Sequence, residues 1–88
     1  MDTEQQQTRR LLVDGAQALL AGRREQARNL LIQCLERDER NAEAWLWISG
    51  AMEERDDIQV ALENCLDCEP DSQRARLGLD WLQTRDKV

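Results

Sequence analysis

The sequence contains no histidine, so it lacks the side chain that most often serves as a general base and that commonly binds zinc. It also has no glycine-rich loop of the kind that holds phosphate groups. Ser49 and Ser72 have structural explanations, the first as a small packing residue and the second as a helix cap. The many carboxylates fall on predicted solvent faces, where they favour solubility. We therefore expect no catalytic residue, no bound cofactor and no metal site.

Long apolar segments are missing as well. The apolar runs are short, such as Leu-Leu-Val and Ala-Leu-Leu, whereas a membrane-spanning helix needs about 20 apolar residues. The N-terminus lacks the apolar core of a signal peptide. The net charge is −6 and the basic residues form no stripe, which disfavours binding to nucleic acid. We expect a cytoplasmic protein with no membrane or nucleic-acid partner, and an odd number of cysteines agrees with a reducing compartment.

Glycine and proline are sparse, with four glycines and one proline in 88 residues. Strand-type alternation is absent and β-branched residues are few, so the chain is expected to be all-α and to form one domain, 1–88. Gly22 is expected to end the first helix, Asn41 is expected to cap the third, and Asp71 and Ser72 are both candidate caps for the fifth. The predicted helices cover about 3–21, 24–37, 42–54, 56–68 and 73–85. Their short connections make successive helices antiparallel neighbours.

The apolar pattern repeats along the chain. The second predicted helix has apolar residues at i, i+3, i+4, i+7 and i+8, and the fourth repeats them 31 residues later. The first and third helices align at a shift of 34. The chain is therefore predicted to use one helix-turn-helix unit twice and then to add a single helix. The matching even-helix positions are Ala27, Leu30, Leu31, Cys34 and Leu35 with Ile58, Ala61, Leu62, Cys65 and Leu66. The matching odd-helix positions are Leu11, Leu12, Gly15 and Ala18 with Trp45, Leu46, Ser49 and Met52.

The repeated unit resembles the tetratricopeptide repeat. That family's pattern has an aromatic residue followed by Leu-Gly and a second aromatic in the first helix, then Ala and an aromatic in the second helix, and a proline after it. The second unit is three residues short between its helices, and the first has Glu39 in place of the proline. The positions that carry the resemblance are Leu11, Gly15, Gly22, Ala27, Leu31 and Cys34 in the first unit and Trp45, Ile48, Ser49, Met52, Ile58, Leu62, Cys65 and Pro70 in the second.

The resemblance implies a right-handed α-α superhelix of antiparallel helix pairs. Its units would cover about 8–41 and 42–72, with a capping helix at about 72–85. It also implies a concave groove that binds another protein or peptide without catalysis. An apolar groove suits an apolar or amphipathic helix. The groove residues implied are Leu12, Ala16, Leu19, Leu20, Leu46, Trp47, Gly50, Leu77 and Trp81. The positions where family members clamp a terminal carboxylate hold Arg9, Leu12, Ala16, Glu43, Leu46 and Gly50, so capture of an acidic C-terminus is not expected.

Other interpretations of the apolar surface remain open. Stacked helices bury two faces, so Trp47 and Trp81 have a purely structural explanation as packing residues between units. The first helix has a wide apolar arc with no obvious partner on its outer side. A second copy of the chain in a homodimer is one way to cover that arc, because two-fold contacts are the commonest oligomeric solution. The two hypotheses, an open groove and a homo-oligomer, do not exclude each other.

A third hypothesis rests on the Cys-x-x-Cys segment at Cys65 and Cys68, a pattern found in thiol redox proteins and zinc sites. Redox pairs lie at helix N-termini, where the dipole lowers the thiol pKa. This pair is predicted at a C-terminal end, with Asp67 and Glu69 beside it. Zinc prefers four ligands, and the sequence offers only Cys34 as a third. Packing between helices explains Cys34 and Cys65 more simply.

Overall fold

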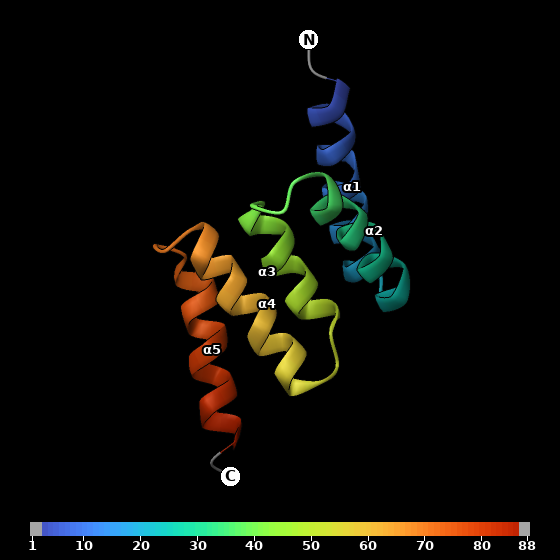
Figure 1. Cartoon of the computed structure of the whole chain (residues 1–88). Coiled ribbons are helices and arrows are strands. Elements are labelled where there is room, and N and C mark those ends of the chain that lie inside the picture. Colours follow the sequence, from blue (N-terminus) through green and yellow to red (C-terminus); the bar gives the residue numbers. More distant parts are fainter. Residues whose placement is uncertain (1–2, 87–88) are drawn as a thin grey trace.

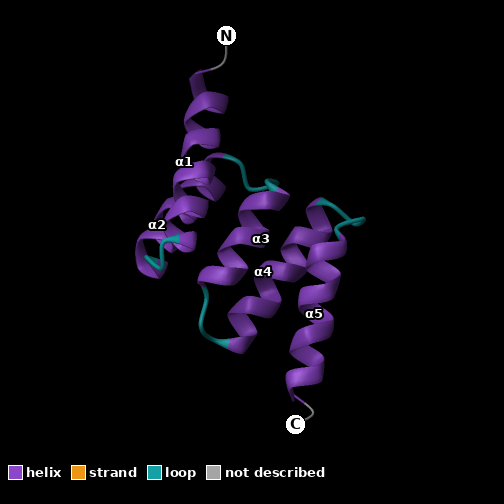
Figure 2. Ribbon diagram, turned by 180° about the vertical axis from the view of Figure 1, so that it is seen from behind, coloured by secondary structure: helices purple, strands orange, loops and turns teal. Residues whose placement is uncertain are grey.

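The computed structural model describes residues 3–86, which form five α-helices with no strand among them (Figures 1 and 2). This confirms the prediction of an all-helical chain with five helices. None of the helices within residues 3–86 is long and apolar enough to cross a membrane. The helices are α1 (Thr3–Leu20), α2 (Arg24–Arg37), α3 (Ala42–Ala51), α4 (Arg55–Cys68) and α5 (Gln73–Asp86).

The helices are arranged as two antiparallel pairs followed by a single helix. α1 packs on α2, α3 packs on α4, and α5 packs on α4. The odd-numbered helices all run in the same direction (Figure 1). The molecule is elongated and thin, 49 × 28 × 16 Å, because most contacts join helices that are neighbours in sequence. Contacts of α3 with α1 and α2 join the two pairs.

Gly22 forms the turn inside the first pair. Its φ of +81° lies in the left-handed region, and no other described glycine has a positive φ. The Gly22 N–H donates to the Leu19 carbonyl at 3.0 Å, and the Arg23 N–H donates to the Ala18 carbonyl at 2.8 Å. This pair of bonds is the Schellman motif, which satisfies carbonyls that the helix end leaves without a partner. The sequence prediction that Gly22 ends α1 is thus confirmed.

A Gly22→Ala substitution is expected to lower the free energy of unfolding by about 1–2 kcal/mol. The reason is the steric cost of a β-carbon within a residue at positive φ. A clash with neighbouring residues does not contribute, because no atom lies within 4 Å of the position where the β-carbon would be placed. Thermal unfolding should show a fall in Tm of about 4–8 °C per kcal/mol. Gly22→Asn is the control and should lose less, because Asn tolerates this conformation. Equal losses for the two variants would contradict the explanation.

The turns after α2 and α4 have the same backbone structure. α2 ends as the Asp38 N–H donates to the Cys34 carbonyl at 2.9 Å, and α4 ends as the Glu69 N–H donates to the Cys65 carbonyl at 2.8 Å. The φ and ψ angles are −147° and 85° at Asp38, and −142° and 87° at Glu69. The 31-residue repeat that the sequence shows is therefore also a repeat of turn geometry.

The same equivalence extends to the caps of the following helices. The Asn41 side chain accepts a hydrogen bond from the Ala44 N–H at 3.0 Å and caps α3. Ser72 accepts one from the Ala75 N–H at 3.3 Å at the start of α5. Both are N-cap bonds that satisfy a backbone donor of the first turn. Position 41 and position 72 are both caps that the sequence predicted.

Each turn is also held by a side chain from the first turn of the next helix. The Trp45 indole N–H donates to the Glu39 carbonyl at 2.9 Å. Thirty-one residues later, the Arg76 guanidinium donates to the Pro70 carbonyl at 2.9 Å. α5 therefore stands to α4 as α3 stands to α2 in these turn contacts.

The connection between α3 and α4 differs from the prediction. α3 ends at Ala51, although the sequence suggested an end near Glu54. The backbone at Met52 and Glu54 is extended, with ψ angles of 149° and 134°. Here the chain has no glycine to make the left-handed turn seen at Gly22. An extended linker replaces it, and the shortness of the second unit comes from this change.

Three groups of buried side chains form the core. One lies where α2, α3 and α4 meet around Leu31 and Ile48, and a second joins α4 to α5 around Leu62 and Leu82. A third, smaller group joins α1, α2 and α3. It consists of Ala18, Ala27 and Ala51. Trp45 packs against both larger groups and connects them.

Candidate functional site

An open cleft of 650 Å³ lies between α1 and the N-terminal half of α3. Its apolar wall comes from α1, where Leu12, Ala16 and Leu20 are spaced four residues apart on one face. Trp47 of α3 faces them across the cleft. Charged residues border the end near the α2–α3 turn: Arg9, Asp38, Arg40, Glu43 and Glu69. The cleft is thus apolar in the middle and mixed in charge at one end.

Four of the nine groove residues implied by the resemblance line this cleft, namely Leu12, Ala16, Leu20 and Trp47. Leu19 and Gly50 instead bring α1 and α3 together, since a β-carbon at Gly50 would lie 3.0 Å from Leu19 Cδ2. Leu46 packs against the core between α4 and α5. The sequence reasoning placed all nine residues on one surface, whereas Leu19, Gly50 and Leu46 lie at contacts between helices.

The remaining two, Leu77 and Trp81, lie on α5, away from the cleft lining. Their side chains are 67% and 58% exposed. The Arg85 guanidinium lies 5.4 Å from the centre of the Trp81 ring, a cation–π contact. An exposed tryptophan and leucine side by side are unusual on a solvated helix and point to an interaction surface.

Trp47 combines the two roles that the sequence left open. It is partly buried and packs against the core group around Leu31. It also lines the cleft beside α1. Trp47 therefore contributes to the packing between the helix pairs and also to the lining of the cleft.

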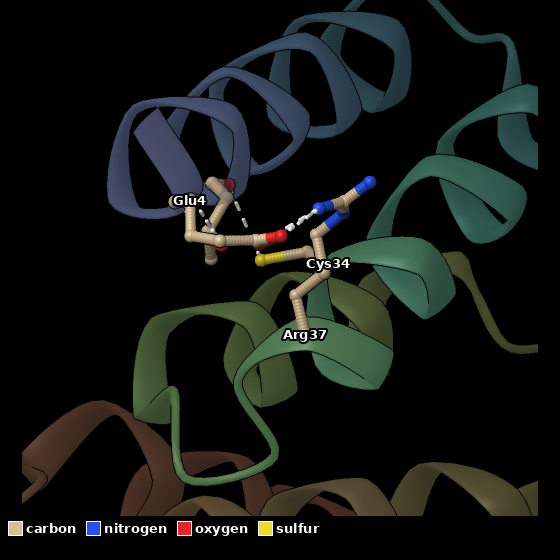
Figure 3. Close-up of polar contacts among 4 residues, drawn as sticks. Glu4, Cys34 and Arg37 are labelled. Atoms are coloured by element: carbon tan, nitrogen blue, oxygen red, sulfur yellow. Dashed lines mark hydrogen bonds and ion pairs between the residues drawn. The ribbon is translucent and has the colours of Figure 1, made fainter. Parts of the chain in front are cut away.

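A second, more polar hollow of 940 Å³ lies at the start of α1 beside the end of α2. Arg37 forms an ion pair with Glu4, with Nη1 at 2.8 Å from Oε2 and 3.0 Å from Oε1 (Figure 3). The Thr8 hydroxyl donates to the Glu4 carbonyl at 2.8 Å, and the Cys34 thiol donates to the Thr8 carbonyl at 3.5 Å. These contacts fix the first two turns of α1, which hold Arg9 and Leu12 at the cleft.

The sequence analysis did not single out Glu4 or Arg37. They are 33 residues apart, and no motif connects them. Thr8 is a buried polar residue on a helix whose neighbours are exposed. The sequence could have predicted only the bond between the Thr8 hydroxyl and the Glu4 carbonyl, because a threonine in a helix often bonds to the carbonyl four residues earlier.

The cysteines take different positions in the structure. Cys34 and Cys65 are buried at equivalent places in the repeat, each with its sulfur 3.8 Å from the capping side chain, Asn41 or Ser72. Burial raises the pKa of both thiols, and at Cys34 nearby Asp38 raises it further. At Cys65 the hydrogen bond with Ser72 lowers the pKa in part and Glu69 raises it, so that the net direction is still upward. Cys68 is partly exposed and lies near the Glu39 carbonyl. No group of three potential metal ligands occurs within the described residues.

These positions predict how the thiols respond to pH. Because the pKa values of Cys34 and Cys65 are higher in the folded chain, the unfolded chain loses these protons first as pH rises. Stability should therefore fall once pH passes the ordinary thiol pKa of about 8.5. The chain has no tyrosine and a single lysine, so few other groups titrate in this range. Urea unfolding between pH 7 and 10 measures the effect.

Thiol counting gives the matching control. A thiol reagent at pH 8 should label Cys68 quickly and Cys34 and Cys65 only after unfolding, because the latter two are buried. A Cys34→Ala, Cys65→Ala double variant should lose most of the alkaline decrease in stability. Equally fast labelling of all three thiols would contradict the burial argument.

Comparison with protein-family models, with curated proteins and with solved structures finds no match. The fold and the cleft define the chain by themselves as a small all-helical protein built from a repeated helix-turn-helix unit.

Proposed function

We propose that this chain is a non-catalytic protein-interaction module of the tetratricopeptide type, which binds an apolar or amphipathic helical segment in the cleft between α1 and α3. The observation that carries the proposal is the apolar wall of that cleft, Leu12, Ala16 and Leu20, facing Trp47. A ligand helix with apolar residues at i and i+3 or i+4 matches a wall spaced in this way.

Repeated turn geometry supports the tetratricopeptide part of the proposal. In a solenoid each unit packs on its neighbours through the same contacts. Here the turn after α2 and the turn after α4 share their backbone bonds and caps. A right-handed superhelix whose concave side carries the cleft is the arrangement that we propose for these units.

The composition of the cleft supports a helix over an acidic chain terminus. A terminal carboxylate needs several convergent cations or amide donors. The cleft end instead combines Arg9 with the carboxylates of Asp38 and Glu43, and the Arg40 guanidinium already donates to the Asp67 carbonyl at 3.2 Å. With three free thiols, the module fits a reducing cytoplasm, the compartment that we propose for it.

Photo-crosslinking tests the proposal. A benzophenone amino acid at position 16 places the reactive group inside the cleft, and the same group at position 60 serves as the control on the exposed face of α4. We expect position 16 to capture helical, apolar segments that position 60 does not. Shortening the cleft wall by Leu20→Ala in the same chain should reduce the yield. Equal products from both positions would contradict the proposal that the cleft is the binding site.

A second candidate function, homo-oligomerisation, is favoured by the exposed Leu77 and Trp81 on α5. In this case the apolar surface of one chain is covered by another copy, and that second copy is also the occupant of the cleft.

A further inference from the structure

The exposed face of α5 carries a stripe with charge at both ends. Arg74, Leu77, Trp81 and Arg85 are spaced by three, four and four residues, and all four side chains are exposed. Leu77 and Trp81 form the apolar centre. Of the five helices within residues 3–86, α5 is the one with no acidic residue in its first turn. The stripe therefore has the composition of an amphipathic ligand for an apolar groove with acidic residues around it.

The 31-residue repeat shows where this stripe lies. Arg74 has the place on α5 that Glu43 has on α3, and Glu43 borders the cleft. Leu77 has the place of Leu46, which is covered by the core between α4 and α5. On α5 the corresponding leucine stays 67% exposed. The stripe thus begins on the side where the cleft opens, and it lacks the cover that the repeat supplies one unit earlier.

The length of the stripe matches the cleft, and Arg74 has carboxylates within the cleft lining to pair with. From Arg74 to Arg85 the helix rises about 16 Å, and the part of α1 that lines the cleft, from Arg9 to Leu20, rises the same distance. If a docked α5 runs parallel to α3, Arg74 lies at the end of the cleft that holds the Glu43 carboxylate.

We infer that the cleft between α1 and α3 binds α5 of a second copy of this chain, with Leu77 and Trp81 against the apolar wall. This inference rests on the proposed function of the cleft and names its occupant. α1, α3 and α5 all run in one direction (Figure 1). A two-fold axis parallel to that direction places α5 of each protomer in the cleft of the other and keeps the helices parallel.

The reciprocal arrangement gives a closed dimer with a larger contact area than a single stripe supplies. A specific interface buries about 800 Å² on each partner, more than one leucine and one tryptophan can supply. In the reciprocal dimer each protomer contributes both its stripe and its cleft. Two-fold closure also prevents the open filaments that a head-to-tail contact produces.

The experiment uses a one-to-one mixture of the full chain in ¹⁴N and ¹⁵N forms, each with the benzophenone group at position 16. After irradiation and trypsin digestion, we expect crosslinks between the peptides 11–23 and 77–85, and we expect half of them to join opposite isotopes. Position 60 is the control and should give no crosslink to 77–85. Crosslinks only within one isotope would overturn the inference, because the contact would be intramolecular.

Sedimentation velocity over a hundredfold concentration range gives an independent readout. We expect a monomer–dimer equilibrium whose dissociation constant rises at least about tenfold in Trp81→Ala, since tryptophan dominates interfaces. Val60→Ala removes an exposed apolar side chain outside the proposed contact and should change it less than about twofold. A monomer at every concentration, or a dimer that Trp81→Ala leaves unchanged, would overturn the inference.

Failure of this inference differs from failure of the proposed function. If position 16 captures helical segments of other proteins and never 77–85, the cleft binds helices but the second copy is not the occupant. If position 16 captures nothing that position 60 does not, the cleft binds no helix and both proposals are wrong.

Discussion

Leu31→Ala is expected to lower the free energy of unfolding by about 3–4 kcal/mol, in the middle of the range for buried leucines. Leu31 is 0% exposed and lies in the core group shared by α2, α3 and α4. Its side chain also fills the space above Gly15 of α1, so its removal leaves a cavity among four helices. An 88-residue domain has a total stability of roughly 4–13 kcal/mol, so this change takes a large share of it.

The contact with Gly15 gives a sharper test. A β-carbon at Gly15 would lie 2.7 Å from Leu31 Cγ, closer than packed carbons approach. Gly15→Ala alone should therefore lose about 1 kcal/mol, because overpacking outweighs the gain in helix propensity. In the double variant with Leu31→Ala, the new methyl group occupies part of the cavity. We expect the double variant to be about 1 kcal/mol more stable than Leu31→Ala.

Urea unfolding followed by circular dichroism measures these differences. Ile32→Ala is the matched control, because Ile32 is the next residue on α2 and is 40% exposed, whereas Leu31 is 0% exposed. Its loss should stay below about 1 kcal/mol. Additive losses in the Gly15 and Leu31 double variant would show that the two positions do not share one cavity.

Trp45→Ala is expected to cost about 3 kcal/mol, at the lower end of the range for buried tryptophans because Trp45 is only partly buried. Two effects contribute. The ring packs against both large core groups, so its loss weakens the connection between the helix pairs. Its indole N–H also donates to the Glu39 carbonyl at 2.9 Å and holds the α2–α3 turn.

Trp45→Phe separates these effects, since it keeps an aromatic ring and removes the hydrogen bond. We expect a loss of about 1–1.5 kcal/mol from the lost hydrogen bond and the smaller ring, because the exposed Glu39 carbonyl can bond to water instead. Trp81→Ala, measured at low protein concentration, is the control for a tryptophan outside the core and should lose less than about 0.5 kcal/mol. Equal losses at positions 45 and 81 would contradict the assignment of Trp45 to the core.

Several structural features could be predicted from local sequence. Gly22, Asn41 and Ser72 mark helix ends because the physical cause lies within one or two turns of the residue itself. The 31-residue apolar repeat likewise predicted that two turns would share one geometry. The end of α3 was the exception. The sequence predicted an end near Glu54, whereas α3 ends at Ala51 and the backbone at Met52 is extended.

The candidate site was less predictable. The resemblance placed Leu46 and Trp47 in one groove, but it could not say which neighbouring helix packs against each of them. In the structure Leu46 is covered by the core next to α5, and Trp47 packs toward α1 and lines the cleft. Glu4 and Arg37 illustrate the same difficulty, because an ion pair across 33 residues depends on how two helices are placed.

The helical class of this chain, its repeated helix-turn-helix unit and most of its helix ends follow from the order of its amino acids alone. Short-range effects produce them: apolar spacing, capping bonds and the backbone freedom of one glycine. Which apolar residues are buried and which stay exposed depends instead on how the helices pack. Leu46 and Leu77 hold the same place in the repeat, yet one is packed and the other is 67% exposed. The difference arises because burial requires a neighbouring helix, and α5 is the last helix that the structure describes.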